Sequence, residues 1–140
     1  MIAQIPKSHR NLIDNAYCVA LTTVMPNGQP QTTPVWCNSE GDYVLINTMR
    51  GFRKEKNIRK NSKVTILAYD PQNPLYNIEI RGTVAEMTEE GALEHLDNLT
   101  QLYLKKPGAK FFGDSVPEEL RATHTPILVK IIPNRIRVEG

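Results

Sequence analysis

Residues 16–38 read AYCVALTTVMPNGQPQTTPVWCN, two runs rich in β-branched and aromatic residues on either side of an Asn-Gly pair. Asn-Gly between strand-like runs predicts a β-hairpin, because a two-residue type I′ turn needs positive φ at both central positions. We therefore expect strands over residues 16–24 and 30–38. A two-residue turn without a bulge would place Cys18 opposite Cys37 and Thr22 opposite Thr33.

The second run of this hairpin contains two prolines, Pro30 and Pro34. The expected register puts both at non-hydrogen-bonded pairs, so their missing N–H groups affect the other edge of the strand. That edge of the segment QTTPVW therefore cannot form a complete set of backbone hydrogen bonds with a neighbouring strand. It serves either to prevent aggregation or to face a planar ligand with its remaining backbone groups. Trp36, the only tryptophan, is predicted to lie either in the core or at an interface.

The rest of the chain predicts more strands and few helices. We expect strands over residues 43–48, 63–69, 76–87 and 125–138, short helices over 6–15 and 52–60, and one long helix over 88–104 that starts at Thr88. Gly82 indicates a bulge or a close backbone approach, and Pro133 indicates a bulge or break. Mostly antiparallel strands with one late helix favour a small, mainly β barrel over a sandwich.

Length and composition limit the class of protein. The 140 residues, 40% hydrophobic and 23% charged, predict a single globular domain over residues 1–140. No apolar run approaches the ~18 residues of a membrane span, and the polar start MIAQIPKSHR lacks the core of a signal peptide. We expect a cytoplasmic protein without a membrane partner, in which Cys18 and Cys37 are reduced thiols.

Residues 50–63 concentrate positive charge. They hold seven lysines and arginines against the single acid Glu55, a net +6 in a chain whose total is +2, so the remaining residues sum to −4. Such a segment is either a solvated surface or an anion site. The preceding strand ends in Asn47 and Thr48, and Gly51 allows a turn into a helix. This arrangement can direct backbone N–H groups and cations at a phosphate.

Other functional motifs are missing from the sequence. Neither common nucleotide-binding glycine loop occurs, and no Ser/His/Asp set or metal-ligand cluster is visible. The three histidines, His9, His95 and His124, are isolated from other ligand residues, so we expect no metal. The cationic segment has no aromatic residue apart from Phe52, which disfavours nucleic-acid binding. No catalytic residue or substrate can be named.

The order of four segments resembles a known family. PNGQPQTTPVW, GDYVLINT, FRKEKNIRKNSKVTILAYDP and IEIRGTVAEM follow one another as in the pyridoxamine 5′-phosphate oxidase-like split β-barrel proteins, particularly short members that use a deazaflavin coenzyme. The resemblance covers roughly residues 6–138. It implies a six-stranded antiparallel split β-barrel with one long helix and short flanking helices. It also implies a homodimer with cofactor sites at the subunit interface.

The resemblance further implies the residues that hold the cofactor. The cofactor phosphate would lie against the Lys-x-x-Asn region after the third strand. The ring system would lie along the second strand, and residues at the end of the third strand would also contact the cofactor. The implied residues are Thr32, Thr33, Pro34, Val35, Asn47, Thr48, Arg53, Lys54, Lys56 and Asn57. We expect the Lys54 side chain to face solvent when no ligand is bound.

The function implied is an oxidoreductase that transfers a hydride to or from a small organic substrate, with the deazaflavin coenzyme F420 or FMN as cofactor. The surplus cations Arg50, Lys56 and Arg59 suit the anionic tail of F420. The chain ends at Gly140 without the longer tail of true pyridoxamine phosphate oxidases, so we do not expect that activity. The alternative is a flavin- or haem-binding carrier or sensor of the same fold, in which His9, His95 or His124 would be the haem ligand.

Overall fold

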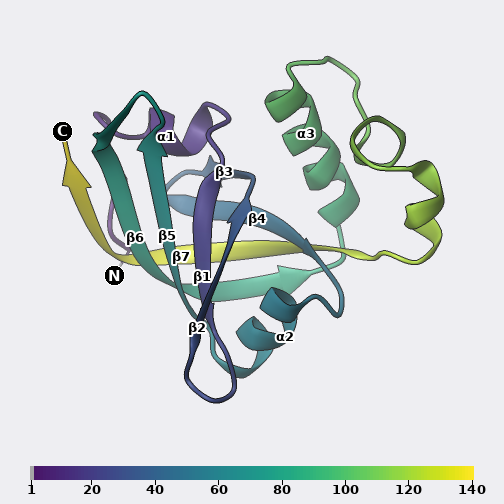
Figure 1. Cartoon of the computed structure of the whole chain (residues 1–140), viewed down its shortest axis with the longest axis horizontal. Coiled ribbons are helices and arrows are strands. Elements are labelled where there is room, and N and C mark those ends of the chain that lie inside the picture. Colours follow the sequence, from purple (N-terminus) through teal and green to yellow (C-terminus); the bar gives the residue numbers. More distant parts are fainter. Residues whose placement is uncertain (1) are drawn as a thin grey trace.

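The computed structural model describes residues 2–140, and its centre is a curled antiparallel sheet of seven strands (Figure 1). The strand order is β2-β1-β5-β6-β7-β4-β3. The strands are β1 Val19–Val24, β2 Pro30–Val35, β3 Cys37–Glu40, β4 Tyr43–Met49, β5 Lys63–Asp70, β6 Asn73–Thr88 and β7 Pro126–Glu139.

The sheet closes on itself at Trp36. β2 and β3 lie at opposite ends of the strand order, yet only Trp36 separates them along the chain. β2 pairs with β1 and β3 pairs with β4, so residues 30–40 pass from one edge of the sheet to the other. The expected strand over residues 30–38 is therefore two strands, and the sheet has seven strands instead of six. With that correction, the predicted split β-barrel is confirmed.

The β1–β2 hairpin has a three-residue loop, so the predicted two-residue turn is wrong. Met25 N donates to Gln29 O and Gly28 N donates to Met25 O, both at 2.8 Å. Gly28 has a φ of 89°, whereas Asn27 does not adopt positive φ. A type I′ turn needs positive φ at both residues, and a loop in which only the glycine is left-handed takes one more residue.

The longer loop shifts the register by one residue. Thr22 pairs with Thr32 instead of Thr33, and Cys37 pairs with Ile46 of β4 instead of lying opposite Cys18. Both cysteines are free thiols, and burial raises the pKa of Cys37 to about 12.

The two prolines of β2 keep the role predicted for them despite this shift. Because Met25 and Gln29 form a hydrogen-bonded pair, the alternation along the ladder puts Pro30 and Pro34 at non-hydrogen-bonded positions. Their missing donors therefore do not weaken the pairing of β2 with β1.

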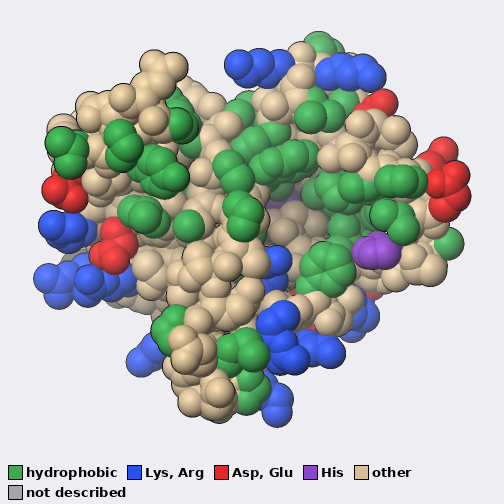
Figure 2. Space-filling model, viewed as in Figure 1, with side chains coloured by type: hydrophobic (Ala, Val, Ile, Leu, Met, Phe, Trp, Pro, Cys, Tyr) green, Lys and Arg blue, Asp and Glu red, His purple; other side chains and the backbone are tan. Residues whose placement is uncertain are grey.

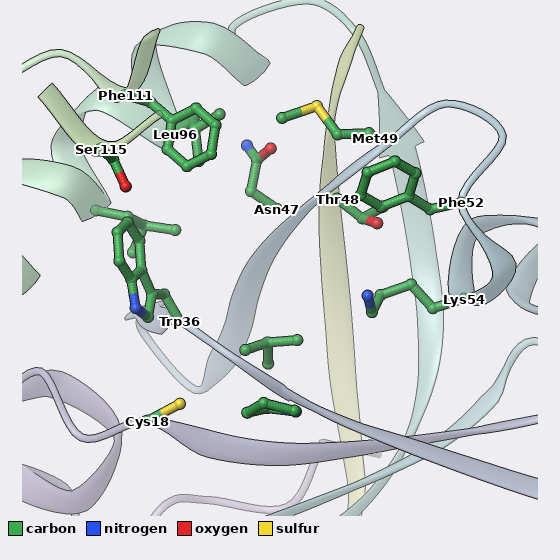
Figure 3. Close-up of a pocket in the computed structure, with 13 residues that line it drawn as sticks. Cys18, Trp36, Asn47, Thr48, Met49, Phe52, Lys54, Leu96, Phe111 and Ser115 are labelled. Atoms are coloured by element: carbon green, nitrogen blue, oxygen red, sulfur yellow. The ribbon is translucent and has the colours of Figure 1, made fainter. Parts of the chain in front are cut away.

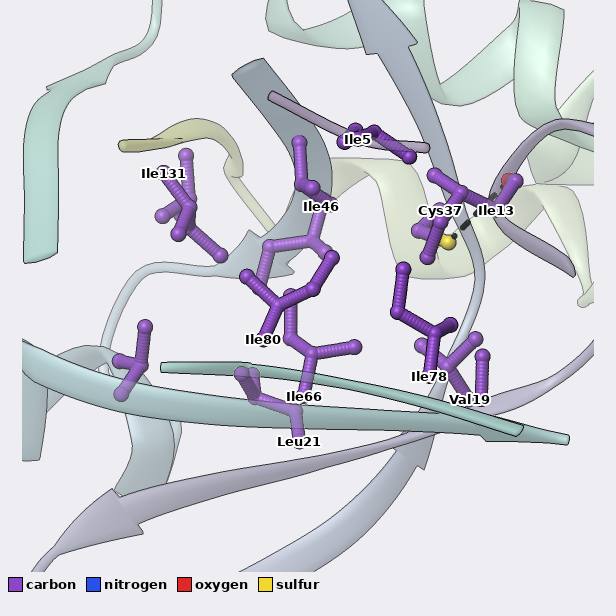
Figure 4. Close-up of a cluster of buried hydrophobic side chains, with 14 of the residues drawn as sticks. Ile5, Ile13, Val19, Leu21, Cys37, Ile46, Ile66, Ile78, Ile80 and Ile131 are labelled. Atoms are coloured by element: carbon purple, nitrogen blue, oxygen red, sulfur yellow. Dashed lines mark hydrogen bonds between the residues drawn. The ribbon is translucent and has the colours of Figure 1, made fainter. Parts of the chain in front are cut away.

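The barrel interior is filled mainly by isoleucine, valine and leucine from every long strand. β-branched side chains pack well on a pleated surface, which explains why these segments form strands. Figure 4 shows side chains from β1, β4, β5, β6 and β7 meeting at the centre. The largest side chains without solvent exposure include Ile46, Ile66, Ile78, Ile80 and Ile131.

Gly82 lies where β6 and β7 leave no room for a side chain on β6. An ideal Cβ at this position would be 2.6 Å from Ile132 O and 2.8 Å from Ile131 Cγ2. The β6–β7 register shifts next to Gly82, which pairs with Pro133. The predicted close approach at Gly82 and the predicted bulge at Pro133 are therefore confirmed.

Three helices lie around the barrel (Figure 1). α1 is Asn11–Asp14, α2 is Arg53–Lys60 and α3 is Ala92–Leu104. α3 and the segment after it, with short turns at Phe111–Ser115 and Glu118–Ala122, stand beside the barrel. None of the helices within residues 2–140 combines the length and apolarity needed to cross a bilayer.

The start of α3 differs from the prediction. Thr88 ends β6, where it pairs with Leu128, and the N-cap of α3 is Gly91 with a φ of 73°. The Thr88 hydroxyl accepts a hydrogen bond from Glu90 N at 3.1 Å. The pairing of β6 with β7 thus extends to Thr88, the residue that was predicted to start the helix.

Candidate functional site

A cavity of about 350 Å³ lies between the barrel and α3. It opens on the face shown in Figure 2, where hydrophobic side chains surround a hollow. Its volume falls in the range of about 300–1,000 Å³ that is typical of small-molecule sites. Most lining side chains are apolar; they are Pro34, Val35, Trp36, Met49, Phe52, Leu96, Leu99 and Phe111. The polar lining residues are Cys18, Asn47, Thr48, Lys54 and Ser115.

Lys54 is the charged residue among those that line the cavity. Its side chain is half-buried rather than solvent-facing as predicted, and its Nζ lies 5.8 Å from the centre of the Phe52 ring. Burial lowers the pKa of Lys54, because water no longer fully solvates the ammonium. Within residues 2–140, no carboxylate forms an ion pair with it. The cavity therefore contains a partly desolvated positive charge without a counter-ion.

Two buried side chains, one an acceptor and one a donor, hold α2 in place. Glu55 is 2% exposed, and its Oε1 accepts a hydrogen bond from Gly51 N at 2.7 Å. Asn57 is 1% exposed, and its Nδ2 donates to Thr23 Oγ1 of β1 at 3.0 Å. These two bonds fix the rotation of α2 about its axis, so that Lys54 lines the cavity while Arg53 and Lys56 are exposed.

Two oxygens of the β4 end lack a partner. Asn47 Oδ1 and Thr48 Oγ1 are buried and form no hydrogen bond with the described residues. A buried polar atom without a partner costs roughly 1–3 kcal/mol, so a ligand that forms hydrogen bonds with these two oxygens would offset that cost. Figure 3 places Thr48 on the same side of the cavity as Lys54.

His95 and Ala92 O hold the amide nitrogen of Asn47. Asn47 Nδ2 donates to Ala92 O at 2.9 Å and to His95 Nδ1 at 3.2 Å. His95 Nδ1 is therefore an acceptor, and His95 Nε2–H donates to Asn38 Oδ1 at 2.9 Å. Burial lowers the pKa of His95 to about 4, so the imidazole is neutral at pH 7. His95 therefore has a structural role, because it holds the Asn47 amide and Asn38.

We expect acid to destabilise the fold through His95. The unfolded chain takes up a proton at this residue near pH 6.5, but the folded chain does so only near pH 4. The unfolded state thus binds more protons between these values, and the free energy of unfolding should fall by about 1–2 kcal/mol as pH decreases from 6.5 to 4. Urea unfolding at several pH values would measure it. His95→Asn should remove this part of the pH dependence, and an identical slope in that variant would contradict the assignment.

An aromatic cluster forms the wall opposite Lys54 (Figure 3). Trp36 stacks on Tyr103 with ring centroids 5.0 Å apart and planes at 15°. Phe111 meets Trp36 edge-on, with centroids 6.3 Å apart and planes at 85°. The cavity thus combines an apolar, partly aromatic wall with a single positive charge. Such an arrangement suits a ligand with a flat ring system and an anionic group.

Of the ten residues that the resemblance implied for the cofactor, five line this cavity and five do not. Thr32 is exposed and its hydroxyl bonds to Thr22 Oγ1 at 2.8 Å. Arg53 and Lys56 are exposed on α2, and Asn57 is a buried anchor. Thr33 also does not line the cavity, and its buried hydroxyl has no hydrogen-bond partner among the described residues. The five residues that do line the cavity are Pro34, Val35, Asn47, Thr48 and Lys54.

Several lining residues were not predicted from the sequence. Leu96 and Leu99 lie at helical spacing in α3, a pattern that indicates core packing. Phe111 and Ser115 belong to an irregular segment that gave no functional signal. Phe52 was noted only as a lone aromatic beside the cations. The other unpredicted lining residues are Cys18, Trp36 and Met49.

The histidines offer limited choices for a haem ligand. His9 Nε2 bonds to Glu139 O at 2.7 Å and its Nδ1 bonds to Ser8 Oγ at 2.8 Å. His95 uses both ring nitrogens. His124 lies beside Phe52, with ring centroids 6.0 Å apart, but does not line the cavity. A haem ligand would therefore have to be His124 or require rearrangement.

Comparisons with known proteins identify sequence and fold relatives. A sequence profile described as Pyridoxamine 5′-phosphate oxidase matches residues 5–135. No curated protein sequence matches the chain.

Solved structures share the fold at low sequence identity. One titled F420 Reductase is 22% identical with a TM-score of 0.79, covering 95% of this chain and 98% of its own. A conserved hypothetical protein from Mycobacterium tuberculosis is 19% identical with a TM-score of 0.71, covering 99% and 86%. General Stress Protein 26 from Bacillus anthracis is 19% identical with a TM-score of 0.67, covering 95% and 92%.

Proposed function

The chain belongs to the pyridoxamine 5′-phosphate oxidase family, and we propose that it is an oxidoreductase that binds the deazaflavin coenzyme F420 or FMN in the cavity beside Lys54. The similar structure titled F420 Reductase is consistent with a cofactor of this type. Both cofactors combine a flat conjugated ring system with a phosphate.

The observation that carries the proposal is the ammonium of Lys54 in an apolar cavity. Its pKa is lowered by burial, and no carboxylate within residues 2–140 forms an ion pair with it. An anionic ligand group would supply the missing counter-charge, and hydrogen bonds to charged groups are about twice as strong as neutral ones. The apolar lining residues then provide the surface for the rest of the ligand.

Three of the polar lining residues have a role in this proposal. Lys54 Nζ binds the phosphate, and the Thr48 hydroxyl donates a hydrogen bond to it. Asn47 Oδ1, whose amide is held by His95 and Ala92 O, is an acceptor for an N–H of the ligand. When bound, either cofactor supplies the hydride chemistry, while the protein positions the reactants and excludes water.

We also propose that the protein is a homodimer acting on a small organic substrate, without nucleic acid or a membrane as a partner. The hollow in Figure 2 is open on one face, so a second subunit could cover a bound cofactor. Light scattering on the purified protein would measure the mass. A monomer at all concentrations would remove the second subunit from this proposal.

The decisive experiment is calorimetric titration of the cofactor-free protein with FMN and, separately, with F420. Tight binding of one cofactor per chain, followed by its reduction or oxidation with candidate substrates, supports the proposal. Binding of neither overturns it. Haem uptake with a Soret band that is lost in His124→Ala would instead identify the haem carrier.

The Thr48 hydroxyl gives a test of the phosphate end. Thr48→Val is nearly isosteric and removes a buried hydroxyl that has no partner in the protein. We expect unfolding free energy to stay the same or rise by up to about 1 kcal/mol, while affinity for the phosphate-bearing cofactor falls about 3- to 10-fold. Urea unfolding and calorimetry measure the two effects. A destabilised variant with unchanged affinity would show that the hydroxyl serves the fold.

A further inference from the structure

Trp36 lies at the point where the chain passes from β2 to β3, and its side chain lines the cavity. Figure 3 shows the indole on the opposite side of the cavity from Lys54, with one face turned toward the centre of the lining residues. Its other face is covered by Tyr103, which stacks on it at 5.0 Å. The tryptophan therefore presents an aromatic surface to whatever occupies the cavity.

Hydrogen bonds fix this aromatic surface in place before any ligand arrives. The Tyr103 hydroxyl accepts from Cys37 N at 2.9 Å and donates to Tyr17 O at 2.6 Å. These bonds hold the backbone at Tyr17 and at Cys37, the residue that directly follows Trp36. Phe111, which meets the indole edge-on, is held by a bond from its own N–H to Asp97 Oδ1 at 2.8 Å. A rigid aromatic surface loses little conformational entropy when a ring stacks on it.

From this geometry we propose that Trp36 is a specificity-determining residue that stacks on a planar conjugated ring of the ligand whose anionic group is bound by Lys54. The inference rests on the anion site of the proposed function and adds the chemistry of the opposite end. The site selects planar conjugated anions over saturated anions of the same charge and carbon skeleton. The ring belongs either to the cofactor or to a substrate that binds beside it.

Two probe anions test the selection directly. The probes are 2-naphthoate and its saturated analogue decahydro-2-naphthoate, which share a charge and a carbon skeleton. Simple apolar burial would favour the saturated compound, because it has more hydrophobic surface. Stacking on an aromatic side chain is specific to the planar compound. We expect the cofactor-free protein to bind 2-naphthoate about 3- to 10-fold more tightly, as measured by calorimetry.

Two substitutions separate this inference from the proposed function. Trp36→Leu should abolish the preference for the planar probe, whereas Lys54→Ala should weaken both probes equally and leave the preference intact. If Lys54→Ala weakens binding but Trp36→Leu keeps the preference, the stacking role is wrong and the anion site stands. If neither substitution changes the binding of either probe, both proposals fail.

A measurement on the unsubstituted sequence covers the case in which Trp36→Leu does not fold. Because the chain has one tryptophan, 5-fluorotryptophan labelling gives a single ¹⁹F resonance. A ring stacked on the indole should shift this resonance, and the saturated probe should shift it little. Saturation with 2-naphthoate without a shift would overturn the proposal.

Titrating the 5-fluorotryptophan protein with FMN or F420 identifies the source of the ring, because the cofactor phosphate and the probe carboxylates compete for Lys54. A shift of the ¹⁹F resonance when the cofactor binds shows that the cofactor ring stacks on Trp36. Cofactor binding without a shift, with the planar preference of the cofactor-free protein dependent on Trp36, shows that the position takes a planar substrate. A planar preference that does not depend on Trp36 contradicts the stacking role.

Discussion

Replacing Lys54 with alanine is expected to weaken binding of the phosphate-bearing cofactor about 10- to 100-fold. The substitution removes a charged hydrogen-bond donor, which contributes about 1.5–3 kcal/mol when its partner is an anion. The fold should be retained, because the ammonium forms no ion pair with the residues that the structure describes and burial disfavours its charged form. Calorimetry with FMN and F420 measures the loss, and urea unfolding verifies the stability.

Lys60→Ala is the matched control for this prediction. Lys60 lies on the same helix and carries the same charge, but it is exposed at the end of α2. If general attraction of anions to the cationic segment dominated, both substitutions would weaken binding to a similar extent. Added salt would then reduce the effect of each substitution. A defect confined to Lys54→Ala shows that position, and not net charge, makes the site.

Gly82→Val is expected to destabilise the protein by about 3 kcal/mol or more. The new side chain would begin 2.6 Å from a backbone oxygen of β7, so β6 and β7 would have to separate at the centre of their pairing. Overpacking in a well-packed region costs about 1–3 kcal/mol, and here one of the clashing atoms belongs to the backbone and cannot rotate away. Chemical unfolding provides the measurement.

The control for Gly82→Val is Ala85→Val, an exposed position of the same strand. It adds β-branched bulk to β6 at a position exposed to solvent, so its effect should stay within about 0.5 kcal/mol. Equal destabilisation by both substitutions would show that β6 tolerates no added bulk anywhere, and would remove the special role of Gly82. β7 also pairs with β4, so Gly82→Val should secondarily disturb Asn47 and Thr48.

Local sequence predicted the features that depend on neighbouring residues. Strand-forming runs, the glycine of a close approach and the cationic turn after β4 are set by residue type and by the side-chain period of the backbone. Asn47 and Thr48 were singled out in this way, whereas Lys54 was named as a phosphate ligand through the family resemblance. The order of these segments also carried the family resemblance, which the match over residues 5–135 confirms.

The register of the hairpin shows where local reasoning failed. Asn27-Gly28 correctly indicated a hairpin, but both a two-residue and a three-residue loop satisfy that sequence, and the choice shifts every opposing pair by one residue. The observed register pairs Leu21 with Thr33 and Val19 with Val35, so the less exposed side chains of β2 lie on the same face as the buried side chains of β1. Packing of side chains from distant strands thus decides the register.

The sequence of this protein therefore specifies its strands, its cationic turn and its family, because those depend on short-range pattern and charge. Which residues meet around the cavity depends on the fold. Trp36 becomes part of the cavity wall only because the chain crosses between sheet edges there, and Leu96, Leu99 and Phe111 reach it from α3 and the segment beyond. Lys54 and Lys56 are two positions apart on one helix, yet only Lys54 faces the cavity, since α2 is anchored by Glu55 and Asn57 on its buried side.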